Sequence, residues 1–162
     1  MDISTFIVVA SCCFMAISSL LCALYMALLL NEGYSKQERR LQRAAMMFFL
    51  FYAGIFVARL LYKWYPVAFV SLEPLLYACH TCIGPVLYYI IFKVTPGKEK
   101  KRFPRIHIVL PLIMPVIVAI WMFFVPFEVP LGIVKGFWEL NPDYPLFSQA
   151  FASIIASEIC FD

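Results

Sequence analysis

Three polar residues share one stripe of a long apolar segment, at a spacing that could support proton or ligand chemistry. Glu73, Tyr77 and His80 follow one another at intervals of four and three residues, so a helix places them on one face. A carboxylate, a phenol and an imidazole are costly to bury in a membrane, where such groups often form proton relays or ligand sites. Alternatively, the stripe is the inward face of a helix that hydrogen-bonds to its neighbours.

The preceding apolar stretch offers a partner for this stripe. Arg59 lies three residues before the end of its own stretch, and Glu73 lies near the beginning of the next. Because only a very short turn joins the two stretches, they should form adjacent antiparallel helices with Arg59 and Glu73 at similar depths. The sequence predicts an Arg59–Glu73 ion pair, unless Arg59 snorkels to the headgroups and Glu73 reaches water separately. The candidate polar cluster is therefore Arg59, Glu73, Tyr77 and His80.

Cys79 and Cys82 have the C-x-x-C spacing of redox and metal sites. A thioredoxin-like motif needs a strand-to-helix junction, however, and a zinc site needs two further ligands. Within an apolar segment, cysteine usually serves as a small packing residue. The chain also lacks the P-loop, the nucleophile elbow and the H-E-x-x-H motif. We expect no catalytic residue, no metal and no cofactor, and hence no enzyme activity.

Long apolar helices must position these residues. Hydrophobic residues form 64% of the 162-residue chain and charged residues 14%, whereas about a quarter of a soluble domain is charged. Several runs are long enough to cross a hydrocarbon core of ~30 Å. The expected fold is all-α: a polytopic integral membrane helical bundle with four complete transmembrane helices and a partial fifth, in a single domain over 1–162. The helices are predicted at about 3–30, 44–62, 67–93, 106–127 and 145–160.

Basic residues alternate between the connections. The first connection carries Lys36, Arg39, Arg40 and Arg43, and the third carries Lys93, Lys98, Lys100, Lys101, Arg102 and Arg105. The second and fourth connections have only Lys63 and Lys135, respectively. Because basic loops remain on the cytoplasmic side, this pattern predicts a multi-pass protein with its N-terminus outside.

The fourth connection, 128–145, is predicted to be an outer loop. Its prolines and glycines disfavour a long regular helix. Its aromatic residues Phe137, Trp138 and Tyr144 suit the headgroup belt, or alternatively a cap that faces a ligand.

Three segments carry a pattern more specific than hydropathy. His107 and Pro111 give a His-x-x-x-Pro helix start, the segment 125–129 reads Val-Pro-Phe-Glu-Val, and the segment 144–148 reads Tyr-Pro-Leu-Phe-Ser. In this order, over roughly 103–148, they resemble the N-terminal membrane region of bacterial membrane-anchored AraC-type transcription regulators. The resemblance implies a membrane-embedded sensory or anchoring domain in the bacterial inner (cytoplasmic) membrane.

The same resemblance implies a helix-turn-helix DNA-binding domain after the last membrane helix. The chain contains no recognition helix, so we expect it to be a fragment whose only route to DNA is a missing C-terminal domain. Two alternatives stay open: the membrane input region of a histidine-kinase-type receptor, and a stand-alone small membrane protein such as a transporter subunit. The expected partners are the lipid bilayer and, as a further option, a second copy in a homodimer. The ligand is left unassigned, and no direct nucleic-acid binding is expected.

Overall fold

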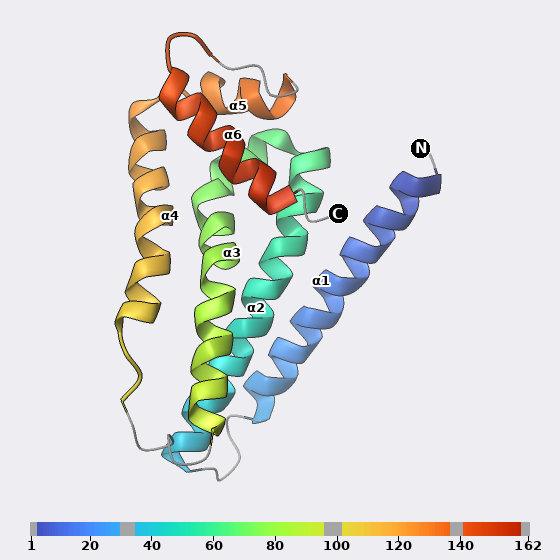
Figure 1. Cartoon of the computed structure of the whole chain (residues 1–162). Helices are drawn as coiled ribbons and strands as arrows, with labels where there is room; N and C mark the ends of the chain where they lie inside the picture. The colour runs from blue at the N-terminus through green and yellow to red at the C-terminus, as the bar shows by residue number, and fades with distance from the viewer. Residues whose placement is uncertain (1–2, 30–34, 96–101, 137–140, 160–162) are drawn as a thin grey trace.

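The computed structural model describes residues 3–29, 35–95, 102–136 and 141–159, and these form α-helices and no strands (Figure 1). The helices are α1 (Ile3–Leu29), α2 (Lys36–Trp64), α3 (Pro66–Val94), α4 (Ile106–Phe124), α5 (Glu128–Lys135) and α6 (Pro145–Ile159). The helices α1 to α4 are long and apolar enough to cross a membrane. The all-α prediction with four such helices is therefore confirmed. Lys98, Lys100, Lys101, Phe137 and Trp138 lie outside the described residues.

α2 begins at Lys36 rather than near residue 44, because its first turns are polar but well capped. The backbone N–H of Glu38 donates to Ser35 Oγ at 3.3 Å, and the backbone N–H of Ser35 donates to Glu38 Oε2 at 2.7 Å. This reciprocal capping box satisfies two backbone donors that a helix start otherwise leaves open. The first basic connection is thus partly helical.

Prolines set the ends of several helices. Pro66 and Pro145 occupy the first position of α3 and α6, where the missing N–H costs nothing. α4 ends at Phe124, short of the predicted residue 127, because Val125 precedes Pro126 and adopts the extended backbone that this position favours.

The segment predicted to be an outer loop contains a helix, α5. Pro130 lies in the first turn of α5, where proline is tolerated, and Gly136 follows its last residue as the C-cap. These residues bound a short helix instead of preventing one. The backbone N–H of Asn141 then donates to Ser148 Oγ at 3.3 Å, which ties the next connection to α6.

The bundle is built from neighbours in the chain. α1 packs on α2, α2 on α3 and α3 on α4, while α6 returns to contact α2, α3 and α5. Figure 1 shows α5 lying across one end of the bundle and α6 running obliquely from that end across α3 toward α2. A single residue, Tyr65, joins α2 to α3, so these helices are adjacent and antiparallel as predicted.

The buried core lies at the α5 end of the bundle. Phe69 and Val70 of α3, Ile133 of α5, and Phe151 and Ile155 of α6 are at most 2% exposed. By contrast, most large apolar residues of α1 and α4 face outward, as expected for helices surrounded by lipid. The α3–α5–α6 contact is therefore the part of the molecule packed most like a soluble core.

Candidate functional site

Two buried carboxylates from different helices form the centre of the polar cluster. Glu73 of α3 is 0% exposed, and Glu158, near the end of α6, is 3% exposed. The two carboxyl groups are close enough to interact electrostatically, and the Tyr77 phenol interacts with both. Two residues of the predicted stripe, Glu73 and Tyr77, thus lie near a residue of the last described helix.

Glu158 was not among the predicted site residues, although the sequence holds a signal for it. Ser148, Phe151, Ile155 and Glu158 recur at intervals of three and four residues, and all four are buried. This spacing marks one face of a helix. A carboxylate on a mainly apolar helix face is a candidate for burial.

The carboxylate pair is not neutralised by the described part of the chain. None of the four carboxylate oxygens of Glu73 and Glu158 has a hydrogen-bond partner there. A carboxylate at membrane depth must acquire a proton, a cation or hydrogen-bond donors, because an isolated buried charge is very costly. The pair is therefore suited to take up a proton or a small cation.

The predicted Arg59–Glu73 ion pair is absent from the described structure. The Glu73 oxygens have no hydrogen-bond partner, and neither does Arg59 Nε. The Arg59 guanidinium instead lies 5.9 Å from the centre of the Phe56 ring and interacts electrostatically with His80. Helix adjacency was predicted correctly, but the side chain of Arg59 packs along its own helix and toward the later part of the α3 stripe.

Cys79 and Cys82 are free thiols within α3. Cys79 packs against Gly54 of α2 so closely that a Cβ at Gly54 would lie 2.8 Å from its Sγ. In the residues that the structure describes, no group of three His, Cys, Asp or Glu side chains is arranged to hold a metal ion. Cys79 therefore acts as a packing residue where α3 contacts Gly54 of α2.

The site thus consists of two parts along α3. Glu73 and Tyr77 lie near Glu158 of α6, whereas His80 lies one turn further on and interacts electrostatically with Arg59 of α2. A proton or cation bound at the first part would change the charge between α3 and α6. Comparison of the chain with protein-family models, curated proteins and solved structures finds no match.

Proposed function

We propose that this chain is the membrane-embedded sensory and anchoring domain of a bacterial transcription regulator. The observation that carries the proposal is the buried Glu73–Glu158 pair, which couples the last described helix to the interior of the bundle. The four apolar helices support the anchoring role. The resemblance of 103–148 to AraC-type membrane regions supports the link to transcription.

The physical basis for sensing is the dependence of α6 docking on the charge of this pair. α6 is held by apolar contacts through Phe147, Phe151 and Ile155, which favour docking in every state. Two like charges in a medium of low polarity oppose docking, whereas a bound proton or cation removes that opposition. The position of α6 would then report the state of the pair to a domain that follows it.

The proposal includes an orientation. The basic end of the bundle, formed by the start of α2, the end of α3 and the start of α4, would face the cytoplasm. The N-terminus and α5 would then lie outside a bacterial inner membrane. In this arrangement, the carboxylate pair lies in the half of the bundle nearer to the outer surface, and α6 points inward.

The test replaces Glu158 with Gln in the full-length native protein and measures all cellular transcripts. We expect a small set of transcripts to change severalfold, because a neutral side chain fixes α6 in its docked state. Glu128→Gln is the matched control, since Glu128 is an exposed acid in the first turn of α5. Transcript levels that stay unchanged even when the whole gene is deleted would refute a regulatory role.

The coding sequence downstream of Asp162 gives a second, independent readout. A helix-turn-helix domain supports the proposal. A phosphoacceptor histidine with an ATP-binding module would instead assign the chain to a histidine-kinase-type receptor, and a stop codon would assign it to a stand-alone membrane protein.

A further inference from the structure

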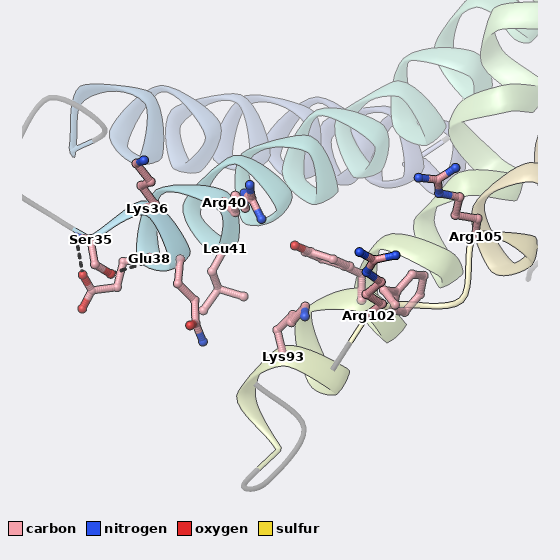
Figure 2. Close-up of a pocket in the computed structure, with 11 residues that line it drawn as sticks. Ser35, Lys36, Glu38, Arg40, Leu41, Lys93, Arg102 and Arg105 are labelled. Carbon is pink, nitrogen blue, oxygen red and sulfur yellow. Dashed lines mark hydrogen bonds between the residues drawn. The ribbon is translucent and has the colours of Figure 1, made fainter. Parts of the chain in front are cut away.

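A large open cavity at the basic end of the bundle has five cationic side chains among its eleven lining residues. Its volume is about 1220 Å³, and it lies between the first turns of α2, the end of α3 and the approach to α4. The basic residues that line it are Lys36, Arg40, Lys93, Arg102 and Arg105. Figure 2 shows Arg40 on the α2 side, and Lys93, Arg102 and Arg105 on the opposite side. We call this cavity the basic groove.

The charge of the basic groove is strongly one-sided. Of its described lining residues only Glu38 is acidic, and the Glu38 carboxylate accepts the backbone N–H of Ser35 in the capping box. Figure 2 shows this hydrogen bond at the first turn of α2, away from Arg102 and Arg105. The acid therefore serves the helix start, and the centre of the groove keeps its excess positive charge.

An aromatic cluster anchors the segment that contains Arg102 and Arg105. The Phe103 ring lies 5.2 Å from the Tyr89 ring, 5.5 Å from the Phe92 ring and 5.9 Å from the His107 ring, measured between centroids. These contacts fix the chain between α3 and α4 at Phe103. Arg102 and Arg105 flank this anchor, so they are presented to the groove from a packed segment.

A second cavity shares the lining residue Tyr89 with the basic groove and lies between α2, α3 and α4. It has a volume of about 350 Å³ and an almost entirely apolar surface, which includes Met47 and Phe51 of α2, Pro85 of α3 and Leu112 of α4. We call it the apolar groove. Tyr89 lines both grooves, and Arg43, which lies one turn along α2 from Arg40, lines the apolar groove.

We propose that the two grooves together bind one anionic phospholipid. Its phosphate lies against Arg40 and Arg102, and an acyl chain follows the apolar groove past Met47 and Leu112. Arginine pairs with phosphate through parallel hydrogen bonds, and basic pockets between membrane helices are suited to anionic headgroups. A soluble anion would use only the basic groove, whereas a lipid accounts both for the charge of the basic groove and for the apolar groove that shares Tyr89 with it.

The test measures lipid binding to the full chain by native mass spectrometry, after reconstitution in phosphatidylcholine nanodiscs. Phosphatidylglycerol is then titrated in. We expect Arg40→Gln and Arg102→Gln each to weaken its binding about fivefold. Arg39→Gln is the matched control: Arg39 is the exposed neighbour of Arg40 and lines neither groove, so this change should have little effect.

The apolar groove is tested with a bulky substitution. Leu112→Trp should fill it and weaken phosphatidylglycerol binding severalfold, while Leu110→Trp, on an outward position of the same helix, should not. Leu112 is 40% exposed and Leu110 is 62% exposed, so neither change disturbs the buried core.

Three results would overturn the proposal. An equal loss with Arg39→Gln and Arg40→Gln would indicate a diffuse attraction to anionic lipid. Equal binding of phosphatidylcholine and phosphatidylglycerol would remove the role of charge. Displacement of the lipid by inorganic phosphate at similar concentration, together with unchanged binding in Leu112→Trp, would identify a soluble anion as the ligand.

Discussion

At the scale of single residues, the Glu73–Glu158 pair is the least expected feature of the molecule. Glutamate is almost never fully buried without a partner, yet both side chains are at most 3% exposed. The pair lies beside the apolar contacts that hold α6 on α3, so its charge acts directly on that contact.

We expect Glu158→Gln to raise the free energy of unfolding by about 1–2 kcal/mol, because the amide has the shape of the acid without its charge. Thermal denaturation in detergent measures the effect, and the cleavage of α6 by a protease serves as the readout of unfolding. Glu128→Gln should leave the midpoint unchanged, since Glu128 is exposed. Lower stability of Glu158→Gln would show that a bound cation or a donor already stabilises the charged form.

The two carboxylates should also be coupled. Glu73→Gln and Glu158→Gln each remove the same repulsion, so the double change should gain less than the sum of the two single changes. In a double-mutant cycle, we expect the sum of the two single gains in unfolding free energy to exceed the gain of the double variant by about 1 kcal/mol, as is typical of residues in one network. Strict additivity would mean that the carboxyl groups do not interact.

Among the helices, the contact between α2 and α3 depends on a missing side chain. Gly54 allows Cys79 to pack directly against the backbone of α2. Small residues serve this purpose in membrane bundles, where helices gain stability from close van der Waals packing.

Gly54→Ala should therefore destabilise the protein by about 1–3 kcal/mol, because its new Cβ would meet Cys79 Sγ at 2.8 Å and Cys79 Cβ at 3.1 Å. Gly84→Ala in α3 is the matched control, since a Cβ there has no neighbour within 4 Å. Alanine at residue 84 should be neutral or slightly stabilising because it favours the helix. The comparison uses thermal denaturation of both variants in the same detergent, and equal midpoints would contradict close packing at Gly54.

Hydropathy was enough to predict the long helices and the α2–α3 hairpin, because a run of apolar residues in lipid has few alternatives to a helix. It could not find the first turns of α2, where the signal was Ser35 and Glu38 in a capping box. α5 was missed because Pro130 and Gly136 were interpreted as breakers, although their positions suit a short helix. Burial of Glu158 depends on the return of α6 to α3, which is a tertiary contact that hydropathy does not contain.

For the molecule as a whole, the distribution of charge predicts its direction across the membrane. Arg102 lies at the basic end of the bundle, and Lys135 lies at the end of α5, at the opposite end (Figure 1). The proposed orientation places the first inside the cell and the second outside.

We expect an Arg102→Cys variant to resist a membrane-impermeant maleimide in intact cells and to react after lysis. A Lys135→Cys variant should react in intact cells. The described native cysteines lie within α1 and α3, and the unsubstituted protein measures their background. Labelling of both introduced cysteines from the same side would contradict the alternating topology.

The order of the contacts along the chain has a consequence for biogenesis. Each of the helices α2 to α4 packs against the helix made just before it, so the helices can enter the membrane one by one during synthesis. α6 is different, because besides α5 it packs on α2 and α3, which have been synthesised long before it emerges. It therefore docks after those helices have been inserted, and until then the apolar residues of α3 that it will cover remain open to chaperones and proteases.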